Sequence, residues 1–154
     1  MAGGLPYLMR TYASPSAGFV RGEGVYLYDK RGRSYLDFIS GLGVNLLGHC
    51  PPEVVRAVRD QADRLFHASN LYRIEGQVQL ARRLCRASFA DRAYFCNSGA
   101  EATDSMIKIA RYFFHKRGET NRTRVLAFEG GFHGRTYGAI SVTSRGKVRE
   151  GFKP

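Results

Sequence analysis

Apolar residues are spaced in two ways along this chain, and each spacing predicts a different secondary structure. Two runs rich in β-branched and aromatic residues, at 25–29 and 34–39, flank a turn at 30–33 that contains a glycine. This arrangement is typical of a β-hairpin. Two more apolar runs, at 94–96 and 123–128, each end in a loop of small residues, so we expect two buried strands there.

Three other segments repeat apolar residues every three or four positions, which is the spacing of an amphipathic helix. The first opens at 51–52 with two prolines and runs to about Phe66, and the second carries its apolar residues at 80–85. The third begins after Ser98 and stops near Gly118. Because two strands are each followed by a loop and a helix, the sequence predicts a parallel α/β sheet with both loops at the carboxyl ends of its strands.

The remaining segments have no regular period. Residues 1–20 are rich in glycine, proline, serine and alanine, and we expect an extended arm. Residues 40–49 contain too much glycine for a regular element and too many apolar residues for a surface loop, which indicates backbone packed closely against another segment. We divide the chain into residues 1–50, with the arm, hairpin and glycine-rich segment, and residues 51–154, with the helices and an incomplete set of strand–loop–helix units. Nothing closes the fold at 151–154, so we expect a truncated sequence.

Composition narrows the class of protein. The chain has 154 residues, 44% of them hydrophobic, and a formal net charge of +11, which suggests an anionic partner. The basic residues form no run of five or more, which disfavours a nucleic-acid-binding stripe. Three cysteines, at 50, 85 and 96, lack disulfide or metal-binding spacing, and there is no long apolar span. We expect a cytoplasmic protein with no metal, no membrane segment and no nucleic-acid partner.

The junction before the third helix is the first candidate for chemistry. A strand that enters a helix through Ser98, Gly99 and Ala100 leaves backbone N–H groups unpaired at the positive end of the helix dipole. Ser98 adds a hydroxyl, and Gly99 lets an anion approach the backbone. A phosphate-binding turn and an ordinary helix-capping turn both explain this pattern, and the turn alone does not choose between them.

The loop at 129–136 offers three different functional groups. Phe132 can stack on a flat ring, His133 can exchange a proton, and Arg135 can hold a carboxylate with two parallel hydrogen bonds. A packed phenylalanine, a hydrogen-bonded loop histidine and a surface arginine are the structural alternatives. A phosphate-binding turn, an aromatic stacker and a carboxylate clamp suit an aromatic phosphate cofactor with an amino-acid substrate, and pyridoxal 5'-phosphate fits that description.

Several strings make the sequence similar to a known family. NSGAEATDSMIKIAR, from residue 97, resembles the cofactor-phosphate segment of the class III aminotransferases, and GGFHGRT, from residue 130, resembles the loop that covers the cofactor ring. GVYLYDKRGRSYLDFISGLGVNLLGH and LFHASNLYRIEGQVQLARRL resemble the family's amino-terminal segments, so the similarity spans nearly the whole chain. HASNLY and FADRAYFCNSGAEA are most similar to the acetylornithine aminotransferases within that family.

The resemblance implies a fold and a set of binding residues. The fold would be α/β, with the amino-terminal arm and hairpin followed by the first part of the large domain of a fold-type I pyridoxal-phosphate-dependent transferase. The implied cofactor-binding residues are Ser98, Gly99, Ala100 and Phe132, and the implied substrate-binding residues are Arg135 and Tyr12. The family also implies a homodimer when the protein is full length.

The same resemblance implies a reaction. The acetylornithine group moves an amino group between N-acetylornithine and 2-oxoglutarate in arginine biosynthesis. Leu42 stands where the ornithine δ-aminotransferases resemble one another in carrying a tyrosine, and a non-aromatic residue there favours an acylated ornithine. Succinylornithine, ornithine, 4-aminobutyrate or an aminomutase reaction are alternatives within the family. A non-catalytic domain that binds a phosphate ligand or nucleic acid is the alternative outside it.

The chain departs from the family pattern in two features and keeps a third. Thr103 and Asp104 replace the usual Asn-Glu, which shortens an acidic side chain. His49 belongs to a family Gly-His pair, and we interpret it as structural. The lysine that anchors the cofactor in the family is not among the lysines here, at 30, 108, 116, 147 and 153. We therefore assign no catalytic residue and expect residues 1–154 alone to be inactive.

Overall fold

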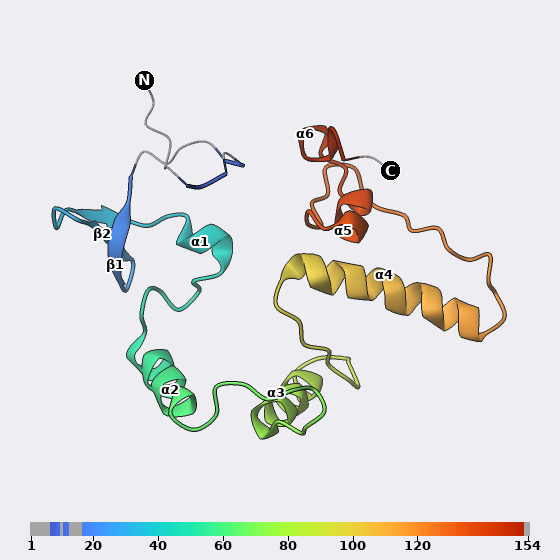
Figure 1. Cartoon of the computed structure of the whole chain (residues 1–154), viewed down its shortest axis with the longest axis horizontal. Helices are drawn as coiled ribbons and strands as arrows, with labels where there is room; N and C mark the ends of the chain where they lie inside the picture. Colours follow the sequence, from blue (N-terminus) through green and yellow to red (C-terminus); the bar gives the residue numbers. More distant parts are fainter. Residues whose placement is uncertain (1–6, 10, 13–16, 153–154) are drawn as a thin grey trace. The chain divides into compact units, whose positions relative to one another are not determined.

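The computed structural model describes residues 7–9, 11–12 and 17–152 (Figure 1). They group into two compact units, which meet in the sequence at Tyr72 and Arg73, and each unit is described by itself. Much of the predicted arm lies outside the described residues. The domain boundary predicted near residue 50 stays a prediction.

The first unit contains a three-stranded antiparallel sheet of β1 (Phe19–Glu23), β2 (Tyr26–Asp29) and β3 (Ser34–Leu36), in that order. β2 and β3 form a hairpin with Tyr26 opposite Leu36, so the predicted hairpin is confirmed. The sequence pattern does not predict β1, because its sequence FVRGE mixes basic, acidic and small residues. β1 becomes a strand by pairing with β2.

Asp29 holds the hairpin turn together. Its carboxylate accepts hydrogen bonds from the backbone N–H groups of Arg31 and Arg33 at 2.9 and 3.0 Å, and from Arg33 Nε at 2.7 Å. Tyr35 adds its hydroxyl at 3.2 Å. Burial alone would raise the pKa of Asp29, but these donors outweigh it and the pKa falls below its usual value. The turn at 30–33 is therefore built around a charged carboxylate.

The glycine-rich segment packs tightly against the sheet, as its composition predicts. Gly24 and His49 form a β-bridge with backbone N···O distances of 3.1 and 2.7 Å. A Cβ on Gly48 would lie 2.7 Å from the Gly24 carbonyl oxygen, so a side chain has no room there. The expectation of no regular element is wrong in one place, because Ser40–Gly43 form a short helical turn, α1, that contains left-handed backbone angles.

Asp37 and His49 tie the two ends of this segment together. Asp37 Oδ1 accepts hydrogen bonds from the backbone N–H groups of Ile39 and Ser40, both at 2.9 Å, and Oδ2 lies 2.8 Å from His49 Nε2. The N–H of Ser40, the His49 ring and the N–H of Ile39 lower the pKa of Asp37. The His49 ring also packs on Gly22, where a Cβ would lie 2.7 Å from it. His49 is thus a structural hydrogen-bonding group, as interpreted from the sequence.

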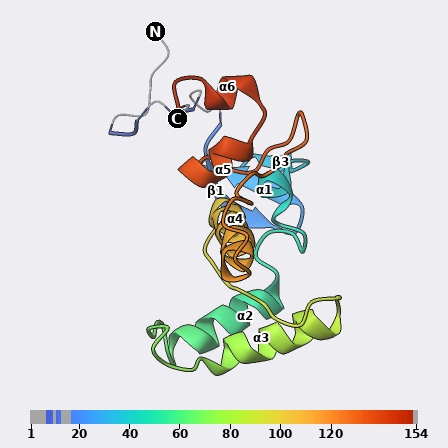
Figure 2. The same ribbon diagram turned by 90° about the vertical axis from the view of Figure 1, so that its right-hand side faces the viewer.

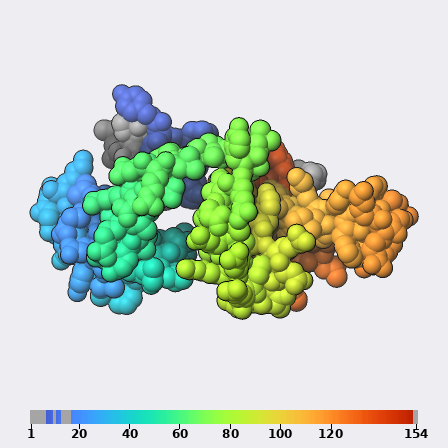
Figure 3. All heavy atoms as spheres, turned by 90° about the horizontal axis from the view of Figure 1, so that it is seen from below, coloured from blue at the N-terminus to red at the C-terminus, as the bar shows by residue number. Residues whose placement is uncertain are grey.

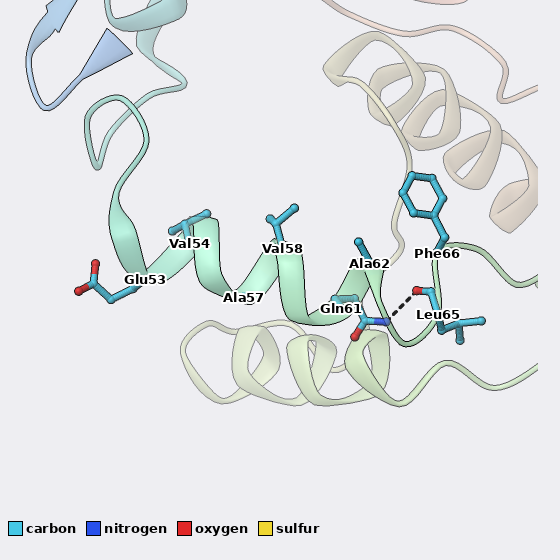
Figure 4. A pocket seen from close by; sticks show the side chains of 8 residues that line it. All are labelled: Glu53, Val54, Ala57, Val58, Gln61, Ala62, Leu65 and Phe66. Atoms are coloured by element: carbon cyan, nitrogen blue, oxygen red, sulfur yellow. Dashed lines mark hydrogen bonds between the residues drawn. The ribbon is translucent and has the colours of Figure 1, made fainter. Parts of the chain in front are cut away.

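Helices α2 (Pro52–Ala62) and α3 (Glu75–Arg86) form where the apolar spacing predicts them, although α2 ends before Phe66. Neither helix buries a residue. Val54 and Val58 project from one side of α2 and line an open groove (Figure 4). Both apolar faces are therefore formed but exposed. No helix among the described residues has the length and apolar character that a membrane crossing requires.

The second unit is built around α4 (Gly99–Lys116) and α5 (Tyr137–Val142), with a short α6 (Gly146–Arg149) after them. α4 ends before Gly118, as predicted. α5 lies over the amino-terminal half of α4 in both ribbon views (Figures 1 and 2). The buried apolar residues of the described chain are Ile107, Ala139, Ile140 and Val142. The small core therefore lies where α5 packs on α4.

The predicted strands at 94–96 and 123–128 are wrong for this structure. Neither segment pairs as a strand, and Tyr94, Leu126 and Phe128 are 67%, 98% and 92% exposed. The orange spheres at the surface in Figure 3 belong to the end of α4 and to the segment after it. A buried parallel strand needs neighbouring strands, and the described residues form no sheet other than that of β1, β2 and β3. The predicted parallel sheet is thus absent from the described part of the chain.

Candidate functional site

The start of α4 is capped by side chains on both sides of its first turn. The Ser98 hydroxyl oxygen accepts a hydrogen bond from the Glu101 N–H at 3.2 Å. The Glu101 carboxylate in turn accepts the Asn97 N–H at 2.7 Å. This reciprocal arrangement is a variant of the capping box, in which the carboxylate binds the N–H of the residue before the N-cap. Of the two explanations that the sequence leaves open, helix capping is present, and it uses the hydroxyl of Ser98.

Two N–H groups at the same helix end can still receive an external anion. Gly99 and Ala100 begin α4, and N–H groups in a first turn have no acceptor inside the helix. A Cβ on Gly99 would meet nothing within 4 Å, so the space beside this turn is open. The pKa of Glu101 is lowered, chiefly by the Asn97 N–H, which keeps the carboxylate charged. An anion bound here therefore shares the positive helix end with Glu101.

The Phe132 loop, residues 129–136, is fixed by the residues that follow α5. The N–H of His133 donates to Thr143 Oγ1 at 3.0 Å. The N–H of Ser144 donates to the Gly131 carbonyl oxygen at 3.1 Å. Neither contact is visible as a sequence motif, and Thr143 was not a candidate in the sequence, because a threonine at the end of an apolar helical run looks like an ordinary helix end.

The Phe132 loop touches the first turn of α4. Gly134 has a φ of +124°, and a Cβ there would lie 2.7 Å from Ala100 Cβ and 3.0 Å from Ala139 Cβ. Only glycine fits so close an approach. Beside this contact lies a hollow of about 660 Å³. Its lining residues are Gly99, Ala100, Thr103, Phe132, His133, Gly134, Arg135 and Thr136.

The hollow collects most of the binding residues predicted from the sequence. Gly99, Ala100, Phe132 and Arg135 all line it, and His133 joins them. Ser98 directly precedes the lining residues and is engaged in the capping box. Tyr12 belongs to the other unit, so its contact with a substrate carboxylate stays a prediction.

Two arginines approach the half-exposed ring of Phe132. The Cζ atoms of Arg135 and Arg145 lie 5.5 and 5.8 Å from the ring centroid. Arg145 Nε also donates to the Gly130 carbonyl oxygen at 3.4 Å. Arg145 was not a candidate in the sequence, where only its positive charge distinguishes it. The two guanidinium groups add positive charge beside a flat ring, which favours an anionic aromatic ligand.

Thr103 and Asp104 belong to the part of α4 that meets α5. Thr103 Oγ1 donates to the Gly99 carbonyl oxygen at 3.1 Å, a bond that threonines inside helices commonly make. Asp104 Oδ1 lies so close to Gly138 of α5 that a Cβ there would collide with it. Asp104, the acidic residue that departs from the family pattern, therefore lies where α4 packs on α5.

Comparison with known proteins gives a family match over nearly the whole chain. The family model described as aminotransferase class-III matches residues 8–154. The acetylornithine aminotransferase of Clostridium acetobutylicum is 45% identical over 148 residues, which cover 96% of this chain and 38% of that protein. That of Aquifex aeolicus is 44% identical over 151 residues, which cover 97% of this chain and 40% of that protein. The chain spans about two fifths of the length of these curated relatives.

Solved structures are similar to this chain over most of its length. An aminotransferase of Bacillus anthracis matches with a TM-score of 0.88 at 28% identity, over 95% of this chain and 33% of that one. An (S)-enantioselective omega-transaminase of Thermomicrobium roseum matches with a TM-score of 0.86 at 34% identity, over 92% and 32%. A PLP-bound amine transaminase from an uncultivated Pseudomonas species matches with a TM-score of 0.88 at 26% identity, over 99% and 37%.

Proposed function

The chain belongs to the class-III aminotransferase family, and we propose that it is the amino-terminal part of a pyridoxal-phosphate-dependent enzyme that transfers an amino group between an amino acid and a 2-oxo acid. The observation that carries this proposal is the shared hollow. There, the first turn of α4 and the Phe132 loop line one space of about 660 Å³. The similar Pseudomonas amine transaminase is known in a PLP-bound form, which supports the same cofactor here.

The donor groups at the hollow fit pyridoxal 5'-phosphate. The N–H groups of Gly99 and Ala100 and the open space beside Gly99 suit the phosphate. The Ser98 hydroxyl lies 3.3 Å from Glu101 Oε2 and joins the phosphate site when it exchanges this carboxylate for a phosphate oxygen. Phe132 presents a half-exposed ring to the pyridine. When bound, the cofactor supplies an electron sink for the proton shift that accompanies amino transfer.

The chain's own residues then bind and orient the substrate. Arg135 offers a planar guanidinium group to a carboxylate of the amino acid or the 2-oxo acid. We propose that Tyr12 assists it. The family's cofactor-anchoring lysine has no match among the lysines of residues 1–154, so we propose that this segment alone holds the cofactor weakly and does not turn over.

The substrates we propose are N-acetylornithine and 2-oxoglutarate, as in arginine biosynthesis. The curated relatives that share 44–45% identity with this chain are named acetylornithine aminotransferases, which supports this choice. Leu42 supports it further, because a non-aromatic and exposed residue offers no hydroxyl to a free second amine. By the same family resemblance we propose a cytoplasmic homodimer.

The test uses the full-length protein that contains this segment. Cofactor binding is followed by absorbance, and amino transfer to 2-oxoglutarate is measured in parallel from N-acetylornithine, succinylornithine, ornithine and 4-aminobutyrate. We expect a coloured complex with the highest kcat/KM for N-acetylornithine. A preference for another donor would correct the substrate within the family. A protein that binds no pyridoxal 5'-phosphate would overturn the proposed function.

A further inference from the structure

Thr143 is the largest completely buried side chain among the described residues, although it is polar. Its hydroxyl oxygen accepts a hydrogen bond from the His133 N–H at 3.0 Å. The same oxygen lies 3.1 Å from the carbonyl oxygens of Gly134 and Ala139, to which its single proton is donated. Burial of a hydroxyl is tolerated only with such partners, so this one is fully engaged.

The three hydrogen-bond partners of the Thr143 hydroxyl belong to two different segments. The bond to Ala139, four residues earlier, is common for a threonine at the end of a helix. The other two partners belong to the Phe132 loop. The His133 N–H is part of the peptide group that begins at Phe132, and the Gly134 carbonyl is part of the peptide group that ends at Arg135. One hydroxyl therefore contacts the peptide group that follows the proposed ring-stacking residue, Phe132, and the peptide group that precedes the proposed carboxylate-binding residue, Arg135.

We propose that Thr143 is a positioning residue for the proposed active site. Its hydroxyl fixes the peptide groups that carry Phe132 and Arg135, and it thereby sets how far apart the pyridine ring and the substrate carboxylate are held. This inference rests on the proposed function. Thr143 does not line the hollow, so it acts through the loop.

Neighbouring contacts explain why the middle of the loop needs this hydroxyl. One end of the loop is held by the Ser144 N–H, which donates to the Gly131 carbonyl oxygen at 3.1 Å. The other end rests on α4, where Gly134 approaches Ala100 too closely for a side chain. Without the hydroxyl, the N–H of His133 has no acceptor at its place, and the loop shifts to find one.

Variants of the full-length holoenzyme separate positioning from stability. Thr143→Val keeps the shape of the side chain and removes both bonds to the loop, whereas Thr143→Ser keeps the hydroxyl. Ser141→Ala is the matched control, because the Ser141 hydroxyl belongs to the same helix and donates to the Gly138 carbonyl oxygen at 2.7 Å, but it is exposed and does not reach the loop.

We expect Thr143→Val to raise the dissociation constant of pyridoxal 5'-phosphate and the KM for 2-oxoglutarate by about tenfold each, because a hydrogen bond that orders the loop is lost. Thr143→Ser should restore both constants, and Ser141→Ala should leave them unchanged. Amide hydrogen exchange of residues 130–136, measured on the apoprotein by mass spectrometry, should become faster in Thr143→Val and stay unchanged in Ser141→Ala.

Two results would overturn the positioning role of Thr143. A folded Thr143→Val protein with the wild-type cofactor constant and KM, and only a lower Tm, would overturn it, because the hydroxyl would then serve stability alone. Unchanged exchange of the loop would overturn it as well. If the wild-type protein binds no cofactor, the proposed function fails and the exchange measurement alone decides whether Thr143 fixes the loop. Should Thr143→Val not fold, Thr143→Ala, which also lacks the hydroxyl, is measured in the same way.

Discussion

The glycine-rich segment of the first unit and the Phe132 loop of the second each have a polar side chain that binds several of their groups at once, but the two side chains differ in charge. The Asp37 carboxylate binds the N–H groups of Ile39 and Ser40 together with the His49 ring. The neutral Thr143 hydroxyl binds groups of the Phe132 loop instead. A carboxylate loses its acceptor strength when it is protonated, whereas a hydroxyl does not titrate. The glycine-rich segment should therefore respond to pH, whereas the Phe132 loop should respond to changes in side-chain shape.

The two units also differ in how much apolar surface they bury. All buried apolar residues of the described chain lie on α4 and on α5, the helix that Thr143 follows. Among the described residues of the first unit the buried one is Asp29. The apolar stripe of α2 is open to solvent, and Phe66 beyond its end is 90% exposed. The second unit thus has the closely packed corner, where a change of side-chain volume is felt most. The predictions below test this difference.

The largest effect is expected for Gly134→Val. A β-branched residue at φ +124° is strained, and its Cβ would lie 2.7 Å from Ala100 Cβ. We expect the full-length protein to lose about 3 kcal/mol or more of unfolding free energy, measured in denaturant, or not to fold at all.

Gly118→Val is the matched control for this change. Gly118 also has a positive φ, of +80°, but a Cβ there would meet nothing within 4 Å. It therefore reports the backbone strain without the collision. Equal losses at the two positions would show that the approach of the Phe132 loop to α4 contributes nothing, and that the second unit is no more sensitive to shape than a free helix end.

The next largest effect is expected for two substitutions in the full-length protein. One tests the proposed substrate side of the hollow and the other tests its proposed cofactor side. Arg135→Lys keeps the charge but removes the planar fork, so amino-acid affinity should fall while cofactor retention stays near normal. Gly99→Val crowds the N–H groups to which we assign the phosphate and should weaken cofactor retention, with substrate recognition affected only through it. Each loss should be about ten- to a hundredfold in the affected constant, from about 1.5–3 kcal/mol per charge-assisted contact.

Both constants are measured for both variants. The cofactor dissociation constant comes from absorbance, and the KM comes from the N-acetylornithine reaction. Release of cofactor by Arg135→Lys, together with a change of the substrate constant alone in Gly99→Val, would reverse the assignment of the two loops.

A smaller, pH-dependent effect is expected at Asp37. Its pKa is lowered in the folded protein by the Ser40 N–H, His49 and the Ile39 N–H. The stabilisation is therefore present above the ordinary pKa of an aspartate, about 4, and is lost as the pH falls through the lower folded pKa. Hydrogen exchange of residues 38–49, corrected for intrinsic rates, should speed up on acidification in the wild type. Asp37→Asn should exchange fast at every pH.

Asp60→Asn serves as the control for this experiment. Asp60 is an exposed aspartate on α2, in the same unit. Its replacement should leave the pH profile of residues 38–49 unchanged. A wild-type profile that stays flat as the pH falls well below 4 would show that the glycine-rich segment and the Phe132 loop do not differ in the way that the charges of Asp37 and Thr143 indicate.

Local patterns predicted the local elements of this chain. The hairpin, the three long helices and the start of α4 after Ser98 all follow from residues within a few positions of one another. The similar solved structures also confirm the α/β class and the relation to fold-type I pyridoxal-phosphate-dependent transferases. Gly99, Ala100, Phe132 and Arg135 were predicted to share a site, and they line one hollow.

Contacts between distant residues could not be predicted in this way. Residues 94–96 and 123–128 have the composition of strands, but a strand forms only when another backbone pairs with it, and composition does not supply that partner. β1 shows the converse, because it has a poor strand sequence and pairs nevertheless. Thr143 and Arg145 contact the Phe132 loop because the chain returns to it after α5, which residue types alone do not indicate.

The smallest effect is expected at Ser144, the neighbour of Thr143. The Ser144 hydroxyl oxygen is buried and has no hydrogen-bond partner among the described residues, although its backbone N–H holds Gly131. Removing an unsatisfied buried hydroxyl breaks no hydrogen bond and removes a buried polar group. Ser144→Ala should therefore leave the unfolding free energy unchanged or raise it by up to about 1 kcal/mol. Thr143→Ala, one residue earlier, should lower it by about 1–3 kcal/mol because it orphans the His133 N–H. Denaturant unfolding of both variants in the full-length protein makes the comparison. A clear loss of stability in Ser144→Ala would mean that this hydroxyl has a partner in the full-length protein, and the Ser144 side chain would then add to the contacts that Thr143 and Arg145 make with the Phe132 loop.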